Sequence, residues 1–207
     1  MGQINVTYDL GGIEGLCPIE STMHGDSRGY FMETFNQKDM YEAGLYFSFV
    51  QDNQSMSTKG VLRGLHFQKN FPQAKLVRVI KGMVYDVAVD LRAGSSTFGK
   101  HYGVILTEDN LKQYLIPRGF AHGYLVLSDT AEFCYKCDDF YHANDEGGLA
   151  WNDPEIGIEW PELTGTYNGT ASGEVYALKD GTPINLSDKD QKWLGITDHL
   201  RREKLKW

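Results

Sequence analysis

An arginine and a histidine, Arg63 and His66, stand three residues apart in the apolar stretch VLRGLHFQ, residues 61–68. Polar side chains are costly inside an apolar strand unless they find hydrogen-bond partners or serve a function. An imidazole can exchange protons near neutral pH or bind a metal. A single histidine in a strand is also commonly structural, so this stretch by itself leaves both interpretations open.

Four other polar residues lie in or beside strand-like apolar runs. His122 lies in AHGYLVL, Asp86 in VYDVAVDLR, Tyr135 in FCYKC, and Lys75 opens KLVRVI. Each has a structural explanation when taken alone. A strand histidine can be a hydrogen-bonded core residue, a strand tyrosine usually packs in a core or at an edge, and a lysine at a strand start is usually solvated.

A metal site is the first functional alternative for His66 and His122. Metal-dependent cupins bind a divalent ion with two histidines one residue apart, a glutamate and a later histidine. Here the residue two positions after His66 is Gln68, and no acid follows at the required offset. We therefore predict no bound metal.

The three cysteines, Cys17, Cys134 and Cys137, form an odd number. The CxxC spacing of Cys134 and Cys137 lacks the second pair that a structural zinc site needs. A thioredoxin-like pair would open a helix, yet AEFCYKCDDF has the pattern of a strand. We expect reduced cysteines in a cytoplasmic protein.

Short strands must position these residues. The 207 residues are 41% hydrophobic, with 23 glycines and 6 prolines, and short apolar runs alternate with turn signals. This pattern predicts a β-sandwich or barrel. VYDVAVDLR (84–92) shows the period of two most clearly, with one face apolar and the other, bearing Asp86, facing solvent or a polar cavity. Further strands are expected at QYLIP (113–117), GYLVL (123–127) and AEFCYKC (131–137).

Helices are expected only at QKDMYEAG (37–44) and KDQKWLGITDHLRREK (189–204). The whole chain, 1–207, is interpreted as one domain. It comprises a β core over about 20–160, a Gly/Thr-rich surface insertion over about 161–183 and a C-terminal segment, 184–207.

The charge balance excludes some partners. The net charge is -8, from 28 acidic and 20 basic residues, which disfavours binding to nucleic acid. No apolar stretch reaches the roughly 20 residues of a membrane span. The N-terminus lacks a basic region followed by an apolar run, so no signal peptide is expected.

Seven segments in order, and an eighth near the C-terminus, resemble the dTDP-4-dehydrorhamnose 3,5-epimerase family of cupin-type jelly rolls. They are DSRGYFMETFN (26–36), FVQDNQSMS (49–57), VLRGLHFQ (61–68), QAKLVRVIKGMVYDVAVDLR (73–92), IPRGFAHGYLVLSD (116–129), YKCDDFYH (135–142), WNDPEIGIEWP (151–161) and LSDKD (186–190). The resemblance implies a mainly β jelly-roll barrel with short helical additions.

The family acts on a dTDP-4-keto-6-deoxy sugar and inverts C3 and C5 without a bound cofactor. Both carbons flank the C4 ketone, so the reaction needs a base, an acid on the opposite face and a positive group at the enolate oxygen. By resemblance, His66 is the base, Asp190 its carboxylate partner, Tyr135 the acid and Lys75 the enolate stabiliser.

The resemblance also implies the substrate-binding residues and the assembly. His122 and Asp86 match supporting polar residues, and Arg63 and Arg28 match ligands of the diphosphate. The positions near the nucleotide are Phe31, Glu33, Gln51, Asn53 and Tyr141. The family implies a homodimer with strand exchange, in which Arg28 and its neighbours serve the partner's site.

Two local features depart from a simple pattern. Residues three apart in a regular strand point to opposite faces, so we expect a bulge or twist at Gly64 that turns Arg63 and His66 into one cavity. The insertion before LSDKD is longer than is usual in the family. We expect it to leave Asp190 in place, because longer loops add little closure entropy, with Asp188 as the alternative partner.

Two other functions remain open from the sequence. One is a relative that inverts a single carbon, or a ketoisomerase, acting on a related dTDP-4-keto-deoxysugar. The other is a non-catalytic sugar-binding barrel or a metal-dependent cupin. The sequence does not decide between thymidine and uridine, which differ by one methyl group.

Overall fold

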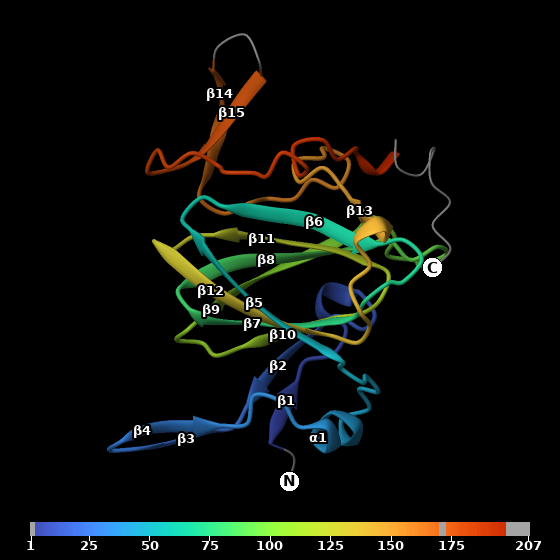
Figure 1. Ribbon diagram of the computed structural model, residues 1–207, viewed down its shortest axis with the longest axis vertical. Helices are drawn as coiled ribbons and strands as arrows, with labels where there is room; N and C mark the ends of the chain where they lie inside the picture. Colours follow the sequence, from blue (N-terminus) through green and yellow to red (C-terminus); the bar gives the residue numbers. More distant parts are fainter. Residues whose placement is uncertain (1–2, 170–172, 198–207) are drawn as a thin grey trace.

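Two antiparallel sheets face each other in the computed structural model, which describes residues 3–169 and 173–197 (Figure 1). The first has the order β1-β2-β10-β7-β12-β5, with β1 at Ile4–Val6, β2 at Cys17–Ser21, β10 at Gln113–Ile116, β7 at Lys75–Lys81, β12 at Thr130–Cys137 and β5 at Gln51–Thr58. The second has the order β13-β6-β11-β8-β9, with β13 at Glu146–Gly148, β6 at Leu62–Gln68, β11 at Phe120–Val126, β8 at Met83–Asp90 and β9 at His101–Thr107. The predicted mainly β, jelly-roll class of fold is confirmed.

The period of two in β8 separates two hydrophobic layers. Val84 and Ala88 belong to the core between the sheets, together with residues of β7 and β12. Val87 and Val89 face the other way and pack under the segment around Trp151 and Trp160. Both faces of β8 are therefore buried, which explains why this strand carries so few exposed positions.

The expected strands occur with small shifts at their ends. β10 and β12 match their predicted ranges closely, whereas β11 begins at Phe120, three residues before the predicted start. The first predicted helix is α1, Gln37–Glu42, whose N-cap Asn36 accepts hydrogen bonds from the backbone of Lys38 and Asp39. Two 3-10 turns lie at Leu10–Gly12 and Ala143–Asp145.

The helix predicted for 189–204 is wrong over residues 189–195, which form turns and an isolated bridge at Leu194. Residues 198–204 of that prediction lie outside the described residues. The backbone of this segment bonds to other parts of the fold: Ala150 donates to the carbonyl of Leu194 at 3.0 Å, and Ile196 donates to the carboxylate of Asp153 at 2.5 Å. These tertiary bonds replace the bonds of a helix.

Two hairpins extend from the sheets at opposite ends of the molecule (Figure 1). One consists of β3, Met23–Asp26, and β4, Gly29–Met32, which pair with each other. The other consists of β14, Leu163–Gly169, and β15, Gly173–Leu178, and forms most of the predicted surface insertion. No helix in the described part of the chain is long and apolar enough to cross a membrane.

Residues 183–197, here called the C-terminal strap, run alongside β6 after the second hairpin. Asn185 donates to the carbonyl of Gly60 at 2.9 Å and accepts from Leu62 at 3.0 Å. Parallel bridges join Val61 to Asn185 and Leu149 to Leu194. The insertion therefore leaves the strap fixed beside the strand that carries Arg63 and His66.

Candidate active site

A bulge at Gly64 turns Arg63 and His66 toward the same cavity. On β11, His122 pairs with His66 and Tyr124 pairs with Arg63, so β6 has one residue more than its partner between these two pairs. Gly64 has φ 120°, and a Cβ there would lie 2.6 Å from the Cα of Gly123. Only glycine fits this backbone without displacing the neighbouring strand. The expected irregularity is confirmed.

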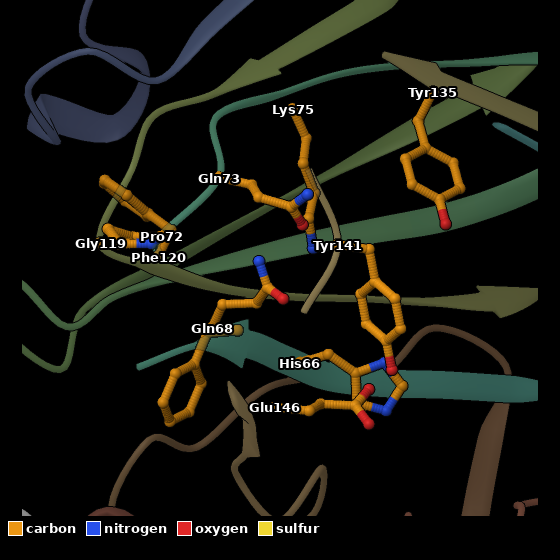
Figure 2. A pocket seen from close by; sticks show the side chains of 11 residues that line it. His66, Gln68, Pro72, Gln73, Lys75, Gly119, Phe120, Tyr135, Tyr141 and Glu146 are labelled. Atoms are coloured by element: carbon orange, nitrogen blue, oxygen red, sulfur yellow. The ribbon is translucent and has the colours of Figure 1, made fainter. Parts of the chain in front are cut away.

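The cavity lies between the two sheets and has a volume of about 640 Å³. His66 and His122 reach it from the second sheet, while Lys75 and Tyr135 reach it from the first. Figure 2 shows a smaller pocket that shares several of these residues, with His66 and Glu146 on one side and Lys75 and Tyr135 on the other. A flat ligand in this space has one group of polar side chains above it and another below.

His66 and Asp190 form a hydrogen-bonded pair. Nε2 of His66 lies 2.5 Å from Oδ1 of Asp190. Asp190 is only 4% exposed. A carboxylate only accepts, so Nε2 carries the proton and Nδ1 is left with a lone pair. Nδ1 has no hydrogen-bond partner among residues 3–169 and 173–197. Asp190, and not Asp188, is the residue that contacts His66.

Three donors hold the Asp190 carboxylate in its ionised form. Burial acts to raise the pKa of Asp190, but hydrogen bonds from His66, Ser187 and Trp193 outweigh burial and bring the pKa below its ordinary value. Trp193 Nε1 donates to Oδ1 at 3.2 Å. The pair thus keeps a negative charge next to the imidazole.

A second imidazole–carboxylate pair lies beside the first. Nε2 of His122 lies 3.1 and 2.9 Å from the two carboxylate oxygens of Asp86. Asp86 was predicted to be a substrate-binding residue, but it is completely buried beneath His122 and does not line the cavity. Its carboxylate instead holds His122 at the cavity wall. Burial lowers the pKa of His122, against the opposing attraction of Asp86.

Tyr135 and Lys75 face the two histidines from the other sheet. Burial raises the pKa of Tyr135, which keeps the phenol protonated at neutral pH. Burial lowers the pKa of Lys75, whose amino group has neither a hydrogen bond nor an ion pair within the described residues. A half-buried, unpaired cation favours any ligand that develops negative charge beside it.

The mouth of the cavity carries groups suited to an anionic, polar ligand. Nε of Arg63 donates to Ser57 at 3.1 Å, and its two terminal nitrogens have no partner in the described part of the chain. Gln51 donates to Asn53 at 2.9 Å and accepts from the backbone of Tyr141 at 3.0 Å. Alternation along β5 turns Gln51 and Asn53 to the same inward face.

Three predicted residues do not line this cavity. Arg28, Phe31 and Glu33 lie on or next to the β3–β4 hairpin, which extends away from the two sheets (Figure 1) and contributes no residue to the cavity. Arg28 pairs with Asp26 at 2.5 Å, and Phe31 is 67% exposed. The hairpin therefore places these three residues outside the cavity of their own chain, and their role in binding the substrate stays a prediction.

Several residues that the sequence reasoning did not single out also line the cavity. Glu146 lies beside His66 in Figure 2 and accepts from Nζ of Lys189 at 2.7 Å. Further polar lining residues include Ser55, Gln73 and Ser187, and Cys137, expected only as a reduced cysteine, lines the cavity as well. Ser55 and Cys137 share a strand face with predicted residues, so alternation could have found them. Glu146 and Lys189 meet only in the folded chain.

Within the described residues, no cluster of three or more His, Cys, Asp or Glu side chains is arranged to hold a metal ion. The polar groups of the cavity are instead arranged as proton donors and acceptors around an open space. The fold and the cavity thus define a jelly-roll protein equipped for proton transfer to and from a bound small molecule.

Comparison with known proteins identifies the family. The sequence model described as dTDP-4-dehydrorhamnose 3,5-epimerase matches residues 11–198. The chain belongs to this family, as its motifs had indicated.

Relatives match along nearly the whole chain. The dTDP-4-dehydrorhamnose 3,5-epimerase of Methanothermobacter thermautotrophicus is 54% identical over 187 residues, which cover 90% of this chain and 92% of the relative. That of Escherichia coli K12 is 52% identical over 176 residues, covering 84% and 95%. The crystal structure of the Legionella pneumophila 3,5-epimerase in complex with dTDP-4-keto-L-rhamnose superposes with a TM-score of 0.81 at 44% identity, covering 94% and 93%.

Proposed function

We propose that the cavity converts dTDP-4-dehydro-6-deoxy-D-glucose to dTDP-4-dehydro-L-rhamnose by inverting C3 and C5, as a step in dTDP-L-rhamnose biosynthesis. The observation that carries this proposal is the placement of His66 and Tyr135 on facing sheets, on opposite sides of one cavity. Inversion of a carbon next to a ketone needs a base on one face and an acid on the other.

The chemistry follows from the protonation states of the site. Nδ1 of His66 removes the proton at C3, and the electron pair of that C–H bond moves to the C4 oxygen as an enolate. The ammonium group of Lys75 stabilises this oxygen. Tyr135 then donates its phenolic proton to the opposite face of C3, which restores the ketone with inverted configuration. His66 then releases its proton to solvent and Tyr135 takes one up. The same steps at C5 give the L-sugar.

Asp190 fixes the reactive tautomer of His66. We expect Asp190→Asn to lower kcat about 100-fold, since loss of the partner that orients a functional histidine typically has an effect of this size. The asparagine amide can donate to Nε2 and so place the proton on Nδ1, the atom that must be basic. Steady-state rates would measure this, with Asp188→Asn as the control that keeps wild-type activity. Equal losses in the two variants would contradict the assignment of Asp190.

Arg63 is assigned to the diphosphate of the substrate. Arg63→Gln should raise KM about 10- to 100-fold and leave kcat near wild type, because hydrogen bonds to charged groups contribute about 1.5–3 kcal/mol. Arg78→Gln is the matched control, since Arg78 is also on a strand but does not line the cavity. A fall in kcat at constant KM would assign Arg63 to the chemical step instead.

We further propose a homodimer in which the β3–β4 hairpin reaches the partner's site. The exposure of Met23, Tyr30 and Phe31 on a hairpin that pairs only with itself in the described chain supports this. Arg28, Phe31 and Glu33 would then contact the nucleotide bound by the other subunit.

The three free cysteines agree with a reducing, cytoplasmic location.

The product of the reaction tests the proposed function. The protein is incubated with dTDP-4-dehydro-6-deoxy-D-glucose, the keto-sugar formed is trapped by a reductase with NADPH, and the reduced sugar is identified by NMR. We expect dTDP-L-rhamnose. A trapped sugar inverted at one carbon alone would contradict the proposal and assign the chain to a single-centre epimerase.

A further inference from the structure

Trp193 contacts the carboxylate of the His66–Asp190 pair but does not itself line the cavity. Its Nε1 donates to Oδ1 of Asp190 at 3.2 Å, and this same oxygen accepts from Nε2 of His66 at 2.5 Å. The indole ring lies edge-on to the imidazole, with ring centroids 6.4 Å apart and an interplanar angle of 71°. One carboxylate oxygen is thus shared between the base and the tryptophan.

The backbone around Trp193 holds the indole in this place. Gly148 pairs with His66 across β13 and β6, and a Cβ at Gly148 would overlap the indole ring. On the C-terminal side, the carbonyl of Leu194 accepts from Ala150 at 3.0 Å. The missing side chain at Gly148 therefore leaves the space that the indole fills, and the strap fixes the ring against β13.

We propose that Trp193 is a positioning residue that limits, through Asp190, how strongly His66 holds a proton; this inference rests on the proposed function. Each hydrogen bond that Oδ1 accepts withdraws negative charge from it. The N–H of Trp193 thereby weakens the attraction between Asp190 and a protonated imidazole.

Other charged and titratable groups also face His66, and the test must leave them unchanged. Arg63 is on the same strand. The remaining groups are Lys75 on β7, His122 and Tyr124 on β11, Tyr135 and Cys137 on β12, Tyr141 in the following loop, Glu146 on β13 and Lys189 on the strap. None of these forms a hydrogen bond with Trp193 within residues 3–169 and 173–197, so removal of the Trp193 N–H acts on His66 through Asp190.

The choice of substitution depends on a second cavity. A space of about 340 Å³, lined among others by Trp151, Tyr176 and Trp193, lies on the other side of Asp190. Truncation of Trp193 to alanine would enlarge this space next to the carboxylate and let water replace the lost donor. Trp193→Phe keeps a ring in place and removes the N–H.

The experiment measures kcat/KM against pH for the wild type and for Trp193→Phe. We expect the acid limb of the profile to move to higher pH by about 0.5 to 1 unit, with the plateau near wild type. Lys192→Ala, a change at the adjacent strap residue, should leave the limb where it is. In an Asp190→Asn background the Trp193→Phe change should no longer move the limb, because the shared carboxylate is absent.

Three outcomes would overturn the inference. The first is a limb that stays at the wild-type pH in folded Trp193→Phe. The second is an equal shift in the Asp190→Asn background. If Trp193→Phe does not fold, 3-benzothienylalanine at position 193 replaces it, because this residue keeps the shape of the indole without its N–H. The third outcome is an acid limb that stays at the wild-type pH in that variant. Wild-type protein that exchanges no substrate protons would instead overturn the proposed function.

Discussion

Replacing His66 by asparagine should lower kcat/KM by about 10⁴-fold, the upper end of the contribution expected from a general base. The asparagine amide can still donate to Asp190, so the carboxylate, 4% exposed, keeps a partner and the fold is retained. What is lost is the lone pair of Nδ1. Because the same nitrogen serves both carbons, the exchange of protons at C3 and at C5 should fall together, as measured by the coupled assay and by NMR.

A matched control distinguishes loss of the base from a general disturbance. His101→Asn changes a histidine on β9 that does not line the cavity, and it should retain wild-type kinetics. If His66→Asn abolished exchange at one carbon and spared the other, a second base would be required. His122, which pairs with His66 across β11 and β6, would then be the residue to test.

Replacing Lys75 by methionine should have the second largest effect, a loss in kcat on the order of 10³-fold. The charge of Lys75 stabilises the enolate more than the ketone, so the loss should fall on kcat and leave KM near wild type. Steady-state kinetics would measure this split. Lys81→Met, an exposed change at the other end of β7, is the control and should be neutral. A rise in KM alone would assign Lys75 to substrate binding.

The same variant should be more stable than the wild type. Burial places the folded-state pKa of Lys75 below its ordinary value, so the folded protein bears a cost for the charge at neutral pH. The unfolded chain binds more protons between the two pKa values, and wild-type stability therefore rises with pH through that window. Lys75→Met should unfold at a higher temperature at neutral pH, and its advantage should shrink as the solution becomes alkaline. A less stable variant would contradict the cost assigned to the unpaired charge of Lys75.

Periodicity and backbone restrictions made much of the fold predictable. The alternation in β8, the strand limits of β10 and β12 and the irregularity at Gly64 all follow from interactions between near neighbours. The helix predicted from residue 189 failed over 189–195 because the carbonyl of Leu194 accepts from Ala150 and the backbone N–H of Ile196 donates to the carboxylate of Asp153, both more than 40 positions earlier. Tertiary contacts of that kind leave no local pattern.

The candidate site was also predictable where local motifs decide it and unpredictable where tertiary contacts decide it. The motifs led to His66, Lys75, Tyr135 and Asp190, and the structure brings these four side chains to one cavity. Asp86 was expected at the cavity wall, yet it lies beneath His122, since an alternating pattern gives the face of a strand but not the depth of a side chain. Glu146, Lys189 and Trp193 belong to segments that the fold alone brings beside His66.

The placement of Arg28, Phe31 and Glu33 shows a further limit. The resemblance implied that Arg28 and its neighbours serve the partner's site, and this stays a prediction, because a single chain places the hairpin but not the assembly. The exposed β3–β4 hairpin supports the proposed dimer, in which these residues contact the partner's site.

The most direct test of the central claim is an NMR time course with dTDP-4-dehydro-6-deoxy-D-glucose in D2O. The claim is that one base and one acid on facing sheets invert both carbons beside the ketone. It predicts deuterium at C3 and at C5 with wild-type protein, and at neither carbon with His66→Asn. Deuterium at C3 alone, or exchange that survives in folded His66→Asn, would contradict it.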